Sequence, residues 1–127
     1  MDQESLAMYA RITTYTCKKG YVDDGVSVAR GLLPRIKALP GLKEFICTGR
    51  MADGKCVTIA IYESKAKAEA AAPKLNELWS HFDHVLASKP EPEGYTVFIH
   101  EKSRPSLRTA PSGPGIESLP HYHRKLA

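Results

Sequence analysis

The sequence lacks long apolar segments, a secretory signal and any compositional extreme. The longest uninterrupted apolar runs are short, such as residues 59–62. They are far below the roughly 20 residues that a membrane-spanning helix needs, so we expect no membrane partner. Residues 1–4 are acidic and no apolar segment of a signal peptide follows them, which predicts a cytoplasmic protein. With 43% hydrophobic and 25% charged residues among 127, the composition excludes collagen-like, wholly disordered and disulfide-scaffold classes and favours one globular domain.

Charge of one sign is not in strong excess, and most of the excess lies near the C-terminus. The formal net charge is +4. Residues 103–127 contain four basic residues and a single acidic one, so the rest of the chain is close to neutral. A nucleic-acid-binding domain needs a basic face on its folded part, and we therefore expect no nucleic-acid partner.

Cysteine is scarce and is not arranged for metal binding. Cys17, Cys47 and Cys56 form no C-x-x-C pair, and each lies in or at the end of a strand-like segment. Zinc sites need clustered ligands, so we expect no metal and three buried, reduced thiols. His121 and His123 form a His-x-His pair, which is a poor metal site because it supplies only two ligands.

Hydrophobic periodicity divides the chain into six elements. Strands are expected at residues 8–17, 42–51, 55–62 and 94–102, and helices at 23–39 and 64–86, with a loop at 89–93. Asp53-Gly54 lies between the second and third strands and is typical of a hairpin turn. Ser64 is the expected N-cap of the second helix.

The order of these elements, β-α-β-β-α-β, predicts the fold class. It is typical of the ferredoxin-like α+β fold, in which two helices cover one face of a four-stranded antiparallel sheet. The strand at 55–62 is apolar on both faces, so the face without helices also needs a cover. A second copy of the chain is the simplest cover, and we expect a homodimer. The domain is expected at 8–102, between an N-terminal extension at 1–7 and an extended or disordered tail at 103–127.

Three short segments carry a resemblance to a known family. They are Lys19-Gly20 after the first strand, the Ala-Leu-Pro-Gly-Leu exit from the first helix at 38–42, and the Ile-Tyr-Glu-Ser-Lys passage at 61–65 into an alanine-rich helix with a tryptophan. The chain resembles the antibiotic biosynthesis monooxygenase domain family of the dimeric α+β barrel superfamily. The resemblance implies a dimeric α+β barrel with a pocket between the sheet and the helices. Some members are cofactor-free oxygenases of quinols and polyketide-derived phenols, some degrade haem, and many have no known activity.

The haem-degrading members provide a residue-by-residue test. They use an Asn on the first strand, a Trp early in the second helix and a His further along that helix. When the chain is aligned with these members on Gly20 and on residues 62–65, the three positions fall on Thr13, Ala71 and His81, so only the histidine matches. A histidine can ligate iron, but helical spacing places His81 at the edge of the apolar stripe, where a solvated side chain is the alternative. We therefore expect no cofactor, with haem as the alternative.

The first strand carries the most informative pattern. Tyr9, Arg11, Thr13 and Tyr15 alternate onto one face, and the alignment turns that face toward the helices. A helix-covered face is normally apolar, and buried Arg and Tyr need partners from a neighbour or a ligand. Two interpretations stay open: a polar-lined cavity under the helices, or an open end of the sheet where Tyr9 and Arg11 reach water.

The resemblance implies roles for these side chains in a cofactor-free oxygenase, where the substrate itself supplies the electrons. Such a protein deprotonates a phenol and stabilises its anion. Arg11 suits the anion, Tyr15 or Tyr62 a hydrogen bond, and Trp79 stacking on a flat ring. The catalytic candidates are Arg11, Tyr15 and Tyr62, and the substrate-binding candidates are Thr13, Asn76, Trp79 and His81.

Several alternatives stay open. Trp79 fits core packing as well as stacking on a substrate. No candidate for the base that deprotonates the phenol is evident in the expected pocket. His100 on the fourth strand is one suggestion, but the sequence does not determine which face of the sheet it lies on. We expect a small aromatic molecule as partner. Three functions remain: a cofactor-independent monooxygenase, a barrel that binds haem or another planar ligand, and a family member whose pocket its own side chains fill.

Overall fold

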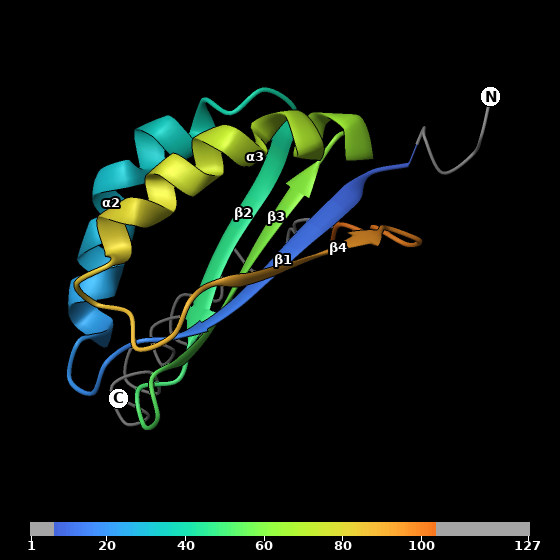
Figure 1. Cartoon of the computed structure of the whole chain (residues 1–127). Coiled ribbons are helices and arrows are strands. Elements are labelled where there is room, and N and C mark those ends of the chain that lie inside the picture. Colours follow the sequence, from blue (N-terminus) through green and yellow to red (C-terminus); the bar gives the residue numbers. More distant parts are fainter. Residues whose placement is uncertain (1–6, 104–127) are drawn as a thin grey trace, which may run out of the picture.

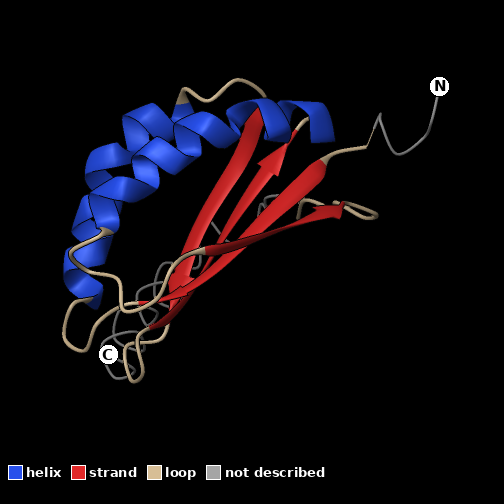
Figure 2. Ribbon diagram, viewed as in Figure 1, coloured by secondary structure: helices blue, strands red, loops and turns tan. Residues whose placement is uncertain are grey.

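The computed structural model describes residues 7–103, in which two helices cover one face of a single sheet (Figure 1, Figure 2). The elements are β1 (Tyr9–Thr16), α2 (Val22–Lys37), β2 (Leu42–Gly49), β3 (Lys55–Tyr62), α3 (Lys65–Trp79), the 3₁₀ helix η1 (Ser80–Phe82) and β4 (Glu91–Thr96). The strands pair antiparallel in the order β2-β3-β1-β4. The predicted ferredoxin-like β-α-β-β-α-β fold is confirmed. No helix in this range is long and apolar enough to cross a membrane.

β1 lies between β3 and β4 and determines which side chains face the helices. Thr13 lies opposite Thr58 of β3 on one side and opposite Pro92 of β4 on the other. Side chains alternate along a strand, so Arg11, Thr13 and Tyr15 share a face. Thr13 is only 4% exposed beneath the helices, which confirms the predicted orientation of this row.

The fourth strand lies earlier in the chain than predicted. It spans Glu91–Thr96 rather than 94–102. It therefore begins inside residues 89–93, which were predicted to form a loop because they contain two prolines. β4 is an edge strand, where proline is tolerated because its missing N–H can face away from the hydrogen-bond ladder. Beyond β4 the chain leaves the sheet, and Phe98 and Ile99 are 91% and 83% exposed. The predicted tail lies outside the described residues except at its first position, and His121 and His123 fall wholly outside them.

The second long helix begins as predicted and ends early. The Ser64 hydroxyl accepts a hydrogen bond from the Lys67 amide at 3.2 Å, which is the expected N-cap contact. α3 ends at Trp79 rather than near residue 86, and η1 and a turn follow. The Ser80 hydroxyl donates to the Glu77 carbonyl at 2.6 Å, and local bonding of this kind competes with the helix ladder.

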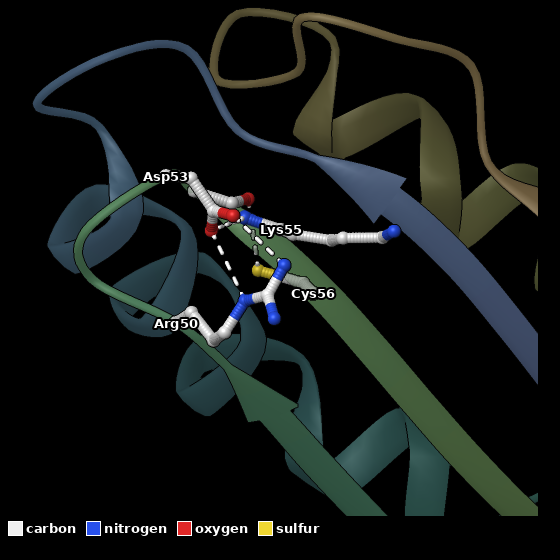
Figure 3. Close-up of polar contacts among 5 residues, drawn as sticks. Arg50, Asp53, Lys55 and Cys56 are labelled. Carbon is white, nitrogen blue, oxygen red and sulfur yellow. Dashed lines mark hydrogen bonds and ion pairs between the residues drawn. The ribbon is translucent and has the colours of Figure 1, made fainter.

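The predicted hairpin between β2 and β3 is confirmed, with Asp53 and Gly54 in its turn (Figure 3). Gly54 supplies a positive φ of 74°, which glycine adopts without steric cost. The Asp53 carboxylate accepts the Lys55 amide at 3.1 Å and pairs with Arg50 at 2.8 Å. The contact with the Lys55 backbone, and then the contact with Arg50, lower the pKa of Asp53. A side chain at Gly54 would meet the Cys17 carbonyl at 2.7 Å, so the turn packs against the end of β1.

The core under the helices consists of two clusters. One joins both helices to η1 and the turn after it, and contains Leu32, Ile36, Leu78, Phe82 and Val85. The other lies between β3 and the start of α3, and contains Leu39, Ala60, Tyr62, Ala68 and Ala71. The apolar stripe predicted for one long helix is therefore divided between α3, η1 and the turn after it, and all three parts are buried in the core.

The opposite face of the sheet has no helix within residues 7–103 (Figure 2). Ile12, Ile59 and Ile61 are half-buried there, and Ile46 on the edge strand β2 is 45% exposed. We refer to this surface as the open face. A second copy of the chain over it stays a prediction.

The segment after β4 returns to the open face. Glu44 of β2 lies opposite Ile61 of β3, and cross-strand partners share a face. The Glu44 carboxylate pairs with His100 at 2.5 Å. His100 therefore lies on the side of the sheet away from the helices.

A close approach joins β1 to the edge strand β4. Gly94 lies opposite Arg11, and a Cβ added to Gly94 would overlap the phenol ring of Tyr9. The absence of a side chain at this position leaves the space that the Tyr9 ring occupies, which is a usual reason for glycine inside a strand.

Candidate functional site

A cavity of about 50 Å³ lies between the helix-facing side of the sheet and both helices, hereafter the inner cavity. It is lined by Arg11, Thr13, Tyr15, Ala29, Leu32, Ile36, Phe45, Cys47, Thr58, Ala60, Leu75, Leu78, Trp79 and Phe82. The helices contribute aliphatic and aromatic walls, and the polar groups come from the strands. Of the two interpretations of the first strand, the structure supports a cavity under the helices.

A second space of about 140 Å³ adjoins the inner cavity toward β4, hereafter the outer groove. Arg11, Thr13, Leu75 and Trp79 line both spaces and form the boundary between them. The rest of the outer groove is formed by Ala72, Asn76, Pro90 and Pro92. Four of the predicted site residues, Arg11, Thr13, Asn76 and Trp79, therefore meet here.

Arg11 is an unpaired cation at this boundary. Its Nε is buried without a hydrogen-bond partner, and no residue of 7–103 forms an ion pair with its side chain. The Arg11 side chain is half-buried, and a buried donor left without a hydrogen-bond partner is costly. The Arg11 guanidinium is therefore placed to receive an anion or another acceptor that the described chain does not provide.

Tyr15 closes one end of the inner cavity. Its hydroxyl lies 3.0 Å from Thr58 Oγ1 and 3.6 Å from Cys47 Sγ. Burial raises the pKa of Tyr15, and the hydrogen bond with Thr58 opposes that rise only in part. The phenol therefore stays protonated at neutral pH. Its ring packs edge-on against Trp79, with the ring centroids 5.0 Å apart.

Trp79 combines the two roles predicted for it. The indole packs on Tyr15 and lies 5.2 Å from Phe82 between ring centroids, as a core residue does. It is nevertheless only half-buried and lines both spaces. Aromatic surfaces of this kind favour flat, apolar ligands.

Tyr62 lies behind the site rather than in its wall. It is 0% exposed, and its hydroxyl has no hydrogen-bond partner. Burial raises the pKa of Tyr62, and the positive charge of Arg11 lowers it. Tyr62 thus adds a second unsatisfied polar group within the electrostatic range of Arg11, although it lines neither space.

The arrangement does not fit haem. His81 is exposed on η1 and lines neither space. The other two haem-aligned positions, Thr13 and Ala71, are buried at 4% and 3% exposure. The inner cavity is also far smaller than a porphyrin. Within residues 7–103, no group of three or more His, Cys, Asp or Glu side chains is placed to hold a metal ion.

The cysteines differ from their prediction at one position. Cys17 and Cys56 are buried free thiols as predicted, with 3.9 Å between their sulfurs. Cys47 is exposed, which contradicts the prediction that all three are buried. The reason is its place on β2, an edge strand that pairs on one side only.

Sequence reasoning missed three residues of the site. Thr58 and Cys47 contact the Tyr15 hydroxyl, and Pro92 forms part of the outer groove. Alternation along β3 is a signal that could have identified Thr58, because it lies directly opposite Thr13. Pro92 gave no such signal, since a proline normally marks a loop.

No protein-family model matches the chain, and its sequence has no match among curated proteins. Solved structures do match. A protein of unknown function from Nitrosomonas europaea has a TM-score of 0.66 at 14% identity, covering 80% of this chain and 99% of that chain. A second Nitrosomonas europaea protein, assigned as an antibiotic biosynthesis monooxygenase, has a TM-score of 0.64 at 16% identity. The match covers 77% of this chain and 95% of that chain. A Bordetella bronchiseptica protein with the same assignment has a TM-score of 0.63 at 11% identity. The match covers 73% of this chain and 99% of that chain.

These structures cover most of the described chain. At such low identities the likeness establishes the fold and leaves the activity open. The predicted resemblance is confirmed at the level of structure: the chain has the fold of proteins assigned as antibiotic biosynthesis monooxygenases.

Proposed function

We propose that the protein is a cofactor-independent monooxygenase that acts on a small phenol or quinol. The observation that carries this proposal is the unpaired, buried Nε of Arg11 at the boundary of two largely apolar spaces. A phenolate offers an anionic oxygen to the guanidinium and a flat ring to Trp79. The fold shared with proteins assigned as antibiotic biosynthesis monooxygenases supports the same class of activity.

Arg11 supplies the electrostatic part of the mechanism. A guanidinium beside a bound phenol favours its ionised form and lowers the pKa of the phenol. Among the described residues that line the two spaces there is no carboxylate and no imidazole, so the phenol proton passes to water. Tyr15 and Tyr62 have raised pKa values and stay protonated. Neither therefore acts as the base. Tyr15 lines the inner cavity and is limited to donating a hydrogen bond, whereas Tyr62 lines neither space and does not touch the substrate.

The bound phenolate supplies every electron that reduces dioxygen. A ring carbon forms a bond to one oxygen atom of O₂, the O–O bond breaks, and the second oxygen atom leaves as water. The C–H hydrogen of that carbon and the O–H hydrogen of the phenol end in the water, and the product is a quinone. The reaction balances without an external reductant.

The remaining site residues position the ring. Trp79 offers its indole face, and Thr13 and Asn76 offer a hydroxyl and an amide at the outer groove. His81 is exposed and has no part in this chemistry.

We also propose that the protein is a cytoplasmic homodimer in which a second copy covers the open face. The half-buried Ile12, Ile59 and Ile61 and the exposed Ile46 support this arrangement. Sedimentation analysis of the full chain tests it. An Ile46→Lys variant is expected to shift the protein toward a monomer, and a wild-type monomer at all concentrations would contradict the proposal.

Oxygen uptake with a panel of hydroquinones and phenols tests the proposed activity. The Arg11→Ala, Tyr62→Phe double variant is expected to lose about 100-fold or more of the rate, because removing a donor to a developing oxyanion has effects of that size. His84 is exposed and lies outside both spaces. His84→Ala is therefore the matched control and should keep the wild-type rate. An undiminished rate in the double variant would contradict the proposed role of Arg11 in a monooxygenase reaction.

A haemin titration addresses the alternative function. Visible absorbance is expected to show no saturable Soret band. A red-shifted band that His81→Ala abolishes would favour the haem alternative over the oxygenase.

A further inference from the structure

The two spaces at the site differ in size, and the difference limits what each can hold. An apolar cavity of about 150 Å³ takes up benzene or xenon. The outer groove, at about 140 Å³, is close to that volume, whereas the inner cavity, at about 50 Å³, has a third of it. A phenol ring therefore fits the outer groove and does not fit the inner cavity alone.

The inner cavity suits a small apolar guest. Leu32, Phe45 and Leu78 are among its walls, and at its polar end the hydroxyls of Tyr15 and Thr58 already bond to each other at 3.0 Å. A buried water needs two to four polar partners. Tyr15 and Thr58 bond to each other, and the unpaired Arg11 lies at the boundary with the outer groove, so the interior of the cavity offers few. Dioxygen is about the size of a water molecule, is apolar, and needs no hydrogen bond.

The outer groove suits a flat ring with one polar substituent. Trp79 from α3 and Pro90 and Pro92 from the β4 segment supply rigid apolar surfaces. Arg11 and Asn76 supply the polar groups of the same groove. The groove therefore offers both apolar surface for a ring and a cation for its anionic oxygen.

We propose that the inner cavity is a dioxygen-binding site and that the phenol ring lies in the outer groove. This inference rests on the proposed oxygenase function and assigns a separate place to each of its two substrates. Because Arg11, Thr13, Leu75 and Trp79 line both spaces, a ring in the groove lies next to a guest in the cavity. The ring carbon that faces the inner cavity is then the one that bonds to O₂, with the bonds formed and broken as given above.

Xenon is the probe for the inner cavity, because it occupies dry apolar cavities. In crystals of the full chain equilibrated with xenon, we expect an anomalous peak among Leu32, Phe45 and Leu78. Ordered water that xenon does not displace, or a peak confined to the outer groove, would overturn the inference. This measurement does not depend on any catalytic activity.

Two matched substitutions separate the spaces. Ala29 on α2 lines only the inner cavity and Ala72 on α3 lines only the outer groove. Both are half-buried helix residues, where leucine has good helix propensity. The probe is 4-nitrophenol under anaerobic conditions, followed by quenching of Trp79, the single tryptophan of the chain.

Opposite outcomes are expected from the two variants. Ala72→Leu should weaken 4-nitrophenol binding about tenfold or more and keep the xenon peak, since added methyl groups in a filled site have effects of this size. Ala29→Leu should lose the xenon peak and leave the Kd for 4-nitrophenol nearly unchanged. Ala60→Val on β3 fills the same cavity if Ala29→Leu does not fold. Nitrophenol binding lost in Ala29→Leu and kept in Ala72→Leu would place the ring in the inner cavity and overturn the inference.

Oxygen kinetics complete the test. With a phenol that is turned over, Ala29→Leu is expected to raise the KM for O₂ about tenfold without changing the KM for the phenol, and Ala72→Leu to do the reverse. An unchanged KM for O₂ in Ala29→Leu would contradict a dioxygen site. If no phenol supports oxygen uptake, the proposed function fails, and the xenon and nitrophenol measurements still decide whether the two spaces hold separate guests.

Discussion

Two tyrosines on the helix-facing side of the sheet are buried in opposite ways. Tyr15 is 7% exposed and its hydroxyl contacts Thr58 and Cys47. Tyr62 is 0% exposed and its hydroxyl has no hydrogen-bond partner, and neither has the buried Nε of Arg11. Unsatisfied buried groups are rare in folded proteins, and stability is commonly given up where a ligand binds. The Tyr15 end is thus a completed part of the core, and Arg11, which lines both spaces in front of Tyr62, is the part that a ligand completes.

The largest test of this comparison replaces the unpaired cation. Arg11→Met is expected to weaken 4-nitrophenolate binding about 100-fold, because a hydrogen bond to a charged group contributes about 1.5–3 kcal/mol. The free energy of unfolding should stay the same or rise by about 1 kcal/mol, since an apolar residue removes a buried donor that has no hydrogen-bond partner. Trp79 fluorescence and urea unfolding measure the two effects. Arg50→Met, which breaks an exposed ion pair, is the control and should leave binding unchanged. Wild-type binding in Arg11→Met would mean that the cation is structural.

A smaller effect is expected from removing one hydroxyl at a time. Tyr15→Phe leaves the buried Thr58 hydroxyl without its partner and should lower the free energy of unfolding by about 1–2 kcal/mol. Tyr62→Phe removes a buried hydroxyl that has no hydrogen-bond partner, so the free energy of unfolding should stay the same or rise. Urea unfolding of both variants gives the difference directly. Equal losses would show that the two tyrosines are not buried differently.

The raised pKa of Tyr15 predicts a dependence of stability on alkaline pH. The folded state holds the phenol proton more tightly than the unfolded state, whose pKa is about 10, because burial raises the pKa of Tyr15. The stabilising contribution is therefore complete below pH 10 and is lost as the pH rises above it. The urea midpoint should fall above pH 10 in the wild type and fall less in Tyr15→Phe. A fall of the same size in both would contradict the assignment to Tyr15.

The smallest effect concerns the exposed hairpin turn (Figure 3). The Lys55 amide and Arg50 lower the pKa of Asp53 below its ordinary value of 3.8. Asp53 therefore contributes stability above that pH, and the contribution is lost as the pH falls through its folded-state pKa. The difference in Tm between wild type and Asp53→Asn should be small at neutral pH and should narrow below pH 4. A difference that grows in acid would reverse the sign assigned to this contact.

The features readable from the sequence were those that depend on neighbours along the chain. Alternation placed Arg11 and Tyr15 on one face of the first strand, and the family resemblance turned that face toward the helices. Local chemistry identified the Ser64 cap and the turn at Gly54. The place of β4 was missed because Pro92 is acceptable only in an edge strand, and being an edge is a property of the whole sheet.

The absence of a partner for Arg11 among the described residues could not be predicted from sequence spacing. The row on the first strand indicated that Arg11 needs a partner. Whether a carboxylate meets it depends on which side chains the folded chain brings to the boundary of the two spaces, and none of the described ones does. The exposure of Cys47 was missed for a similar reason, since it follows from the order of the strands.

The overlap between Tyr9 and any side chain at position 94 has a consequence for how this fold can vary among relatives. The two positions share one volume, so they should change together: a larger residue at 94 is compatible only with a smaller one at 9. A side chain at 94 alone requires the Tyr9 ring to move, and a truncated Tyr9 alone leaves a void. Passage from one combination to the other therefore favours losing the ring first, because a shorter residue at position 9 leaves only a void, whereas a larger residue at 94 requires the Tyr9 ring to move at once.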